Sequence, residues 1–241
     1  MCGRFTQSLS LSDVIAKYSI VTVASTLLEA DTKDPSSSNI FQNYNLAPSQ
    51  SALVVYDNSQ TKTSLSAATF GTKFQFGRNA TATTLINARS ETVASKPTFS
   101  KAFKFRRCIV PANGYFEWAT SNNGTKTPYY ITQNQTPIIS IAGLLYDIEG
   151  KSAQGFVLLT QAANKDISHI HDRMPVFIPE PYQNPWLDTL ATDPHQLQEV
   201  LLKITTINEC QNRSFYEVSR AVGSPTYNSP AAILPLFDQN H

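Results

Sequence analysis

Hydrophobic and polar residues along the chain alternate in short segments that predict a structure built mainly from β-strands. Runs rich in branched and aromatic side chains are separated by turn-forming residues, a pattern typical of strands. The longest apolar run covers residues 138–146 and is too short to cross a bilayer. The predicted strands are Ala52–Tyr56, Thr63–Phe70, Arg107–Ala112, Tyr115–Trp118, Pro128–Thr132, Ile138–Tyr146 and Phe156–Thr160.

Helical periodicity is confined to a few short segments. Ser10 or Ser12 can cap a helix that continues to Tyr18, and the polar stretch Asp31–Asn39 predicts a surface loop. We therefore expect an α+β fold in which peripheral helices surround a mostly antiparallel, curved sheet. No repeat or linker divides the chain, so we expect one domain over residues 2–237 and a short tail at 238–241. The other predicted helices are Ser90–Ala94, Asn164–Ile170, Pro185–Leu190 and His195–Lys203.

Composition restricts the choice of partners and compartment. The 241 residues are 41% hydrophobic, enough for one sizeable core, and the formal net charge of +1 provides no overall field that would attract a polyanion. A nucleic-acid site would have to be a local patch. Cys2, Cys108 and Cys210 lack the spacing of a metal site or a disulfide framework, which favours a reducing compartment. Without a signal peptide, we expect a soluble intracellular protein.

The cysteine directly behind Met1 is the first candidate for chemistry. Terminal residues are usually frayed and dispensable, so Cys2 either has no particular role or is a functional residue at the N-terminus. A small second residue normally permits removal of the initiator methionine, which would place an α-amine and a thiol on one residue. The amine titrates near ~8, so about a tenth of it is uncharged at neutral pH and can attack an aldehyde.

The segment Ile86–Thr92 suggests an anion site. Asn87 precedes a predicted helix start, and Arg89 in the first turn would offer its guanidinium to a phosphate alongside the backbone N–H groups. Simple helix capping is the plainer interpretation of this pattern.

The segment Arg106–Trp118 predicts a strand, an Asn-Gly turn and a second strand. Alternation along the second strand places Tyr115 and Glu117 on one face. A carboxylate beside aromatic rings is expected to be partly desolvated, which would raise its pKa toward neutrality. An exposed, solvated Glu117 fits the local pattern as well.

The fourth candidate segment, His169–Ile178, contains two histidines two residues apart. Their spacing could suggest a metal ligand pair, but the sequence supplies no further ligands at suitable spacing, and we expect no metal. His171, directly before Asp172 and Arg173, is better placed as a proton donor or as a structural histidine.

Read together, these segments closely resemble the SRAP family, named for SOS response-associated peptidase. The resemblance implies a single α+β domain whose sheet folds into a partial barrel. It also implies a sensor of abasic sites in single-stranded DNA, which acts in the DNA damage response by linking its processed N-terminal cysteine to the ring-opened sugar as a thiazolidine. The matching segments, in order, are MCGRF, YNLAPSQ, INARSET, RRCIVPANGYFEW, LLTQAAN, HDRMPVFI and EVSRAVGSP.

The resemblance also implies residue roles. Cys2 is the nucleophile, Asn87 orients its amine, Glu117 is the acid/base group and His171 protonates the sugar oxygen. No cofactor is implied. The implied partners are abasic single-stranded DNA and, as candidates, replication-fork proteins. We expect a DNA-associated monomer that binds no membrane. The implied DNA-binding residues are Arg4, Asn45, Pro48, Arg89 and Thr160.

The chain departs from the family pattern at Phe70–Phe76, FGTKFQF, which lacks the family's tryptophans and proline in the segment that faces DNA. Stacking on neighbouring bases is expected to differ there. Extra basic residues could extend a DNA-binding patch or merely solvate the surface. They are Lys96, Lys101, Lys104, Arg106 and Arg107.

Three other functions compete with this reading. Class II glutamine amidotransferases also begin Met-Cys-Gly, although their glutamine-binding pattern is not found here. A peptidase using Cys2, Asn87, Glu117 and His171 could cleave the Met1 bond, and this activity can coexist with DNA linkage. A non-covalent single-strand-binding module would leave these side chains without a role.

Overall fold

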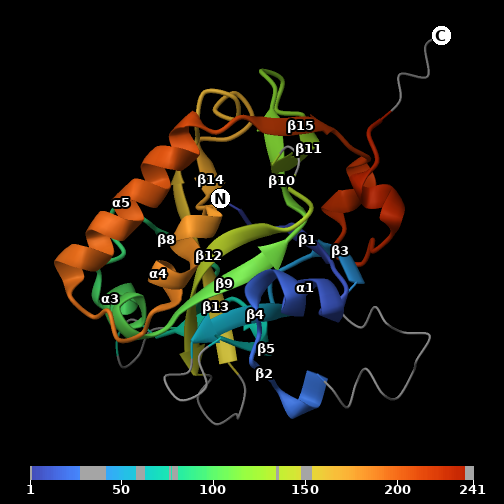
Figure 1. The fold of residues 1–241 in the computed structure, drawn as a ribbon. Helices are drawn as coiled ribbons and strands as arrows, with labels where there is room; N and C mark the ends of the chain where they lie inside the picture. Colours follow the sequence, from blue (N-terminus) through green and yellow to red (C-terminus); the bar gives the residue numbers. More distant parts are fainter. Residues whose placement is uncertain are drawn as a thin grey trace.

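Strands dominate the architecture, and helices cover its periphery (Figure 1). The structure is a computed structural model that describes residues 2–27, 42–57, 63–75, 77, 81–133, 136–147 and 154–236. The predicted α+β class is confirmed. Met1, the predicted loop at Asp31–Asn39, Phe76 and the tail at 238–241 lie outside the described residues.

The smaller of the two main sheets is antiparallel throughout. Its strand order is β15-β11-β10-β1-β3, so the N-terminal strand lies in the interior of the sheet beside β10. Sequence patterns did not predict β1, β3 or β15. The bounds are β1 Phe5–Ser8, β3 Gln42–Leu46, β10 Gly114–Thr120, β11 Lys126–Gln133 and β15 Arg213–Glu217.

The larger sheet is mixed and curved. Its order is β14-β13-β12-β9-β4-β5-β2. Both β8 and β5 also pair with β13 in parallel, so the sheet curls back on itself, although it does not form a closed barrel. The predicted bounds of β5 and β9 are confirmed. The strands are β2 Thr22–Val23, β4 Ser51–Asp57, β5 Thr63–Phe70, β8 Asn87–Arg89, β9 Arg107–Ala112, β12 Ile139–Asp147, β13 Gln154–Ala162 and β14 Arg173–Pro175, with β6 Thr72–Phe74 and β7 Thr83–Leu85 as a separate ribbon.

The helices begin and end at recognisable caps. Ser10 caps α1, as predicted, because its hydroxyl accepts from the Asp13 N–H at 3.1 Å. None of the described helices is long and apolar enough to cross a membrane. The helices are α1 Leu11–Tyr18, α3 Pro97–Phe105, α4 Gln183–Leu187 and α5 Pro194–Cys210, and the 3₁₀ turns are η1 Glu180–Tyr182, η2 Arg220–Gly223 and η3 Pro230–Ile233.

Two predicted helices are wrong. Residues 90–94 form turns, because the Ser90 N–H donates to the Thr160 carbonyl across to β13 at 2.8 Å instead of entering a helix. Residues 165–170 are also consecutive turns, and the side chain of Asn164 before them accepts from the Ile167 N–H at 3.2 Å. In both segments the backbone bonds between residues four apart are isolated, such as the one from the Ser168 N–H to the Asn164 carbonyl at 2.9 Å, so no continuous helix forms.

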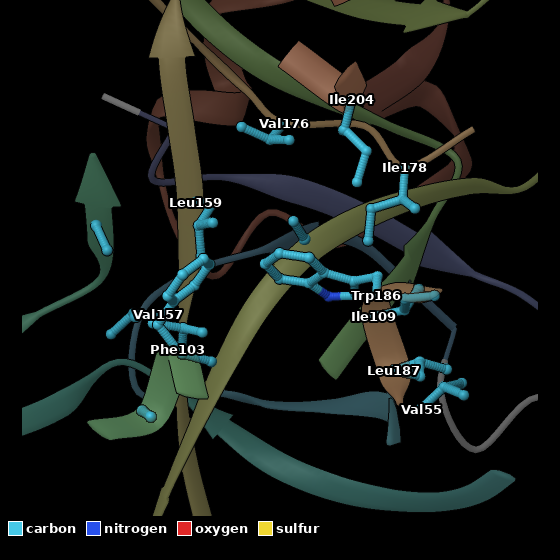
Figure 2. Packing of buried hydrophobic residues seen from close by; sticks show 14 of the residues in the cluster. Val55, Phe103, Ile109, Val157, Leu159, Val176, Ile178, Trp186, Leu187 and Ile204 are labelled. Atoms are coloured by element: carbon cyan, nitrogen blue, oxygen red, sulfur yellow. The ribbon is translucent and has the colours of Figure 1, made fainter. Parts of the chain in front are cut away.

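Both faces of the larger sheet are buried, which explains the continuous apolar run of β4. One face packs against the helices, where the Trp186 indole of α4 lies at the centre of a cluster with Phe103, Ile109 and Leu159 (Figure 2). The indole N–H donates to the Cys108 carbonyl at 2.8 Å. The other face packs against the smaller sheet, and this second core contains Cys2.

The interpretation of Arg107 as part of a basic surface patch is wrong. Arg107 is 1% exposed, and its guanidinium donates to the carbonyls of Phe103, Lys104, Trp186, Asp188 and Ala191. These bonds satisfy the carbonyls that the end of α3 leaves without helical partners and join α3 to the loop after α4.

The Asn-Gly turn does not join two paired strands. β9 belongs to the larger sheet and β10 to the smaller, so the chain crosses between sheets at Asn113. Asn113 N–H donates to the Thr6 carbonyl at 2.9 Å, and the Asn113 side-chain oxygen accepts from Ser8 N–H at 2.8 Å. These bonds tie the crossing to β1, so that β10 continues beside the N-terminal residues.

Candidate functional site

Cys2 lies in the core between the two sheets, immediately before β1. The Phe116 N–H of β10 donates to the Arg4 carbonyl at 2.9 Å, so the terminal residues run antiparallel to β10. The Cys2 side chain is 0% exposed. Burial, followed by the nearby charge of Glu117, raises the pKa of the Cys2 thiol far above its usual range, and the thiol therefore stays protonated at neutral pH.

Asn87 holds the backbone of Cys2. It lies on β8, which pairs in parallel with β13 through Leu158, and not at a helix start as predicted. Its side-chain N–H donates to the Cys2 carbonyl at 3.0 Å. The Asn87 side-chain oxygen is buried and has no hydrogen-bond partner among the described residues. The amide thus holds the backbone of Cys2 and retains one buried acceptor atom.

Glu117 is the buried carboxyl group of the site. It lies on β10 directly opposite Tyr129 of β11 and is 3% exposed, so the alternative of a solvated glutamate is wrong. Burial raises the pKa of Glu117 to about 7. The predicted desolvation is confirmed, and the group can hold or release a proton near neutral pH.

His171 faces Glu117 from the segment that precedes β14. Its Nε2 lies 3.9 Å from Glu117 Oε2, a gap that a water molecule or a substrate oxygen can bridge. Its Nδ1 lies 3.0 Å from the Arg173 N–H and 2.9 Å from the Asp172 carboxylate. Burial lowers the pKa of His171, so the ring is largely neutral at pH 7.

The two neighbours of His171 Nδ1 require opposite proton positions. A neutral Nδ1 can accept from the Arg173 N–H, whereas only a protonated Nδ1 can donate to Asp172. The backbone N–H is a fixed donor, and the Asp172 side chain is 84% exposed and can turn toward water. We therefore assign Nδ1 as the acceptor, which leaves the proton of the neutral ring on Nε2, facing Glu117.

The structure thus brings all four predicted reactive residues to one place from four separate segments. Residues 1–225 match the family model described as SOS response associated peptidase (SRAP). The chain belongs to the SRAP family.

The sequence similarity of this SRAP protein to its relatives extends over nearly its whole length. It is 32% identical over 237 residues to the abasic site processing protein YoqW of Bacillus subtilis (strain 168), which covers 97% of this chain and 99% of YoqW. It is 27% identical over 239 residues to YedK of Escherichia coli (strain K12), also named an abasic site processing protein, with 98% and 100% covered. A crystal structure of a Bacteroides thetaiotaomicron protein shares the fold, with a TM-score of 0.75 at 20% identity over 98% of this chain and 100% of that one.

Two DNA-binding predictions for this SRAP domain fall on residues that hold the C-terminal segment. Arg4 donates to the Asn45 side chain at 2.8 Å and to the Val222 carbonyl at 2.7 Å, and its guanidinium lies over the Trp118 ring. Asn45 is buried and donates to the carbonyls of Val222, Ser224 and Tyr227. Their DNA contacts remain predictions, but both residues have structural partners here.

The other predicted DNA-binding residues have different settings. Arg89 is exposed on β8, two residues from Asn87, where a phosphate could reach it. Thr160 lies opposite Arg89 on β13 and is 1% exposed. Pro48 occupies a tight turn over residues 47–50, in which Ser49 has a φ of 74°. Only Arg89 among these three presents a charge to solvent.

The aromatic residues of the departing segment contribute to the core. Phe70 is fully buried and stacks on Phe156, with ring centroids 5.2 Å apart. Phe74 packs against Phe99 and Tyr146. These two phenylalanines therefore have intramolecular partners, whereas Phe76 lies outside the described residues.

Sequence reasoning missed Arg173 as part of the SRAP site. Its guanidinium forms a bidentate ion pair with Glu91 at 2.5 and 2.8 Å and donates to the Thr160 carbonyl at 2.7 Å. These bonds fix the loop that carries His171 against the segment after β8. The position of Arg173 two residues after His171 could have suggested a role, but its partner Glu91 is distant in the sequence and is found only in the folded structure.

Proposed function

We propose that this protein processes abasic sites in single-stranded DNA by linking Cys2 covalently to the ring-opened sugar. The observation that carries the proposal is the convergence of a buried thiol, an amide bonded to the backbone of the same cysteine, and the Glu117–His171 pair. The names of YoqW and YedK as abasic site processing proteins support the same substrate.

The first requirement is a free amine on Cys2, which removal of Met1 would supply. The Asn87 N–H already holds the Cys2 carbonyl, and its side-chain oxygen can accept one amine hydrogen. That bond would direct the nitrogen lone pair toward the incoming carbon. Preorganisation of this kind lowers the entropic barrier to attack.

The second requirement is an open-chain aldehyde. An abasic deoxyribose equilibrates with this form, and the Nε2–H of His171 is suited to donate a proton to the ring oxygen as the sugar opens. The Cys2 amine adds to C1′, and loss of one water gives an imine. Glu117, with a pKa of about 7, can accept and return protons in these steps.

The third requirement is closure by sulfur. Glu117 gives its proton to the departing water, which leaves a protonated imine. The thiol sulfur attacks the carbon of this protonated imine, the electron pair of the C=N π bond moves to the nitrogen, which keeps its hydrogen, and the thiol proton passes to the Glu117 carboxylate. One aldehyde and one aminothiol thus give one thiazolidine and one water. Because both nucleophiles belong to Cys2, the second attack is intramolecular and gains a large effective molarity.

The test is linkage to an oligonucleotide that contains a single abasic site. Wild-type protein is expected to give a band that survives denaturing electrophoresis, with an intact mass equal to protein without Met1 plus DNA minus one water. Cys2→Ala abolishes the band. Cys2→Ser keeps the amine and gives only an imine, which borohydride reduction traps. Cys210→Ala, a matched change at an exposed cysteine, leaves linkage unchanged.

Several outcomes would contradict the proposal. Equal linkage to intact DNA would remove lesion recognition, and capture of abasic DNA by protein that retains Met1 would remove the role of the Cys2 amine. Release of ammonia from glutamine without DNA linkage would favour an amidohydrolase. If a Glu117→Gln protein keeps Met1 while wild type has lost it, the same site also carries the peptidase activity that the family name implies.

A further inference from the structure

Tyr115 places a buried hydroxyl group beside the site. It lies on β10 two residues before Glu117, on the same face of the strand, and its Cα pairs with that of Phe5 in β1. The side chain is 0% exposed and belongs to the same core cluster as Cys2. Its ring meets Phe177 edge-to-face, with centroids 6.0 Å apart.

The Tyr115 hydroxyl has no hydrogen-bond partner among the described residues. A buried hydroxyl without a partner destabilises the folded state, and a phenylalanine would fill the same space without this cost. Tyr18 shows the usual solution in this protein, because its buried hydroxyl lies 2.8 Å from the Ser140 hydroxyl. The unpaired hydroxyl of Tyr115 is therefore expected to form a hydrogen bond only when the protein acts on its substrate.

Two groups are candidates for the partner in that hydrogen bond: the Cys2 thiol, in the same core cluster as Tyr115, and the Glu117 carboxyl group, two residues further along β10. Burial raises the pKa of Tyr115 well above its usual range. Cys2 and Glu117 raise it further when they are ionised, whereas the Arg213 guanidinium lowers it. The phenol therefore keeps its proton and can serve as a donor. Of these two neighbours, the Cys2 sulfur is the one that develops new negative charge when it gives up its proton to close the ring.

We propose that the Tyr115 hydroxyl is a catalytic hydrogen-bond donor to the Cys2 sulfur during thiazolidine closure. Tyr115 keeps its own proton throughout, while the thiol proton goes to Glu117 and the sulfur forms its bond to the imine carbon. The hydroxyl stabilises the partial negative charge on sulfur in the transition state. This inference rests on the proposed function and adds a residue to it.

The test compares Tyr115→Phe with Tyr18→Phe in the full-length protein. Tyr115→Phe is expected to slow linkage to an abasic oligonucleotide by about 10- to 100-fold, the effect of one hydrogen bond to a charged group. It should unfold at the same temperature as wild type or higher, because an orphan group is removed. Its pH–rate profile should shift to higher pH, since the thiol loses a donor. Tyr18→Phe should do the reverse, with lower stability and an unchanged rate.

The outcomes separate the two proposals. If wild type links to DNA and Tyr115→Phe matches its rate and pH profile, the role of Tyr115 is overturned while the proposed function stands. A Tyr115→Phe protein that unfolds at a lower temperature would also overturn it, because the hydroxyl would then have a structural partner. If wild type forms no link, the proposed function fails, and the role of Tyr115 fails with it.

Discussion

Replacement of the buried Glu117 by glutamine is expected to stabilise the protein at alkaline pH and to remove the proposed proton acceptor of the site. Glutamine has nearly the same shape as glutamate and carries no charge. The carboxylate of Glu117 is 3% exposed, so its ionised form is poorly solvated. The variant therefore separates the effect of the buried charge on folding stability from its proposed effect on the rate of linkage to DNA.

The magnitude follows from the pKa of Glu117. Burial raises it from 4.5 to about 7, so the folded state holds the proton more tightly than the unfolded state. The stability that this group contributes is fully present below pH 4.5 and is lost as the pH rises through about 7. The shift corresponds to about 3 kcal/mol at 1.36 kcal/mol per pH unit. Glutamine avoids this loss.

The assay is thermal unfolding of wild type and Glu117→Gln at pH 5 and pH 8. The advantage of the variant should grow by about 2.5 kcal/mol between these values, or roughly 5–10 °C in Tm for a chain of this size. The comparison between variants cancels the titration of other groups. Glu209→Gln on the exposed face of α5 provides the matched control and should show no such growth.

A constant difference between Glu117→Gln and wild type across this pH range would refute the reasoning. It would mean that Glu117 is ionised at similar pH in the folded and unfolded states. Burial would then not set its proton affinity, and its suitability as an acid/base group near neutral pH would lose its physical basis.

Two further substitutions test how the fold positions the site. Asn87→Ala removes the hydrogen bond to the Cys2 carbonyl and should slow linkage by about 3- to 10-fold in a single-turnover gel assay, with an unchanged rate ruling out the orienting role. Gly114→Ala should destabilise the protein by about 1–3 kcal/mol in a thermal melt, because its new Cβ would lie 2.5 Å from the Tyr130 ring. Gly223→Ala, where a Cβ meets nothing within 4 Å, should melt like wild type, and equal stability of the two variants would contradict the packing argument.

Local pattern was sufficient where local forces decide the structure. The runs at β5 and β9 were predicted with their observed bounds, because branched and apolar residues favour extended, buried backbone whatever their partners. The cap at Ser10 was also predicted, since a hydroxyl and a nearby N–H suffice for it. For Glu117 the local pattern allowed both a desolvated and an exposed side chain, and the structure shows that it is buried.

Local pattern failed where distant segments compete for the same groups. Asn87 was expected at a helix start, yet β13 supplies hydrogen bonds some seventy residues away and draws the segment into a strand. Arg107 was grouped with surface charges, yet carbonyls at the ends of α3 and α4 enclose it. A sequence window contains none of these partners.

Residue types along the chain were enough to identify the candidate reactive groups: a cysteine behind Met1, and an asparagine, a carboxyl group and a histidine in segments typical of the SRAP family. Only the tertiary structure decided their proton affinities and distances. The pKa values of Cys2 and Glu117 depend on burial between two sheets, and the unpaired hydroxyl of Tyr115 depends on what surrounds it there. Side-chain type is a local property of the chain, whereas desolvation is a property of everything that packs around it.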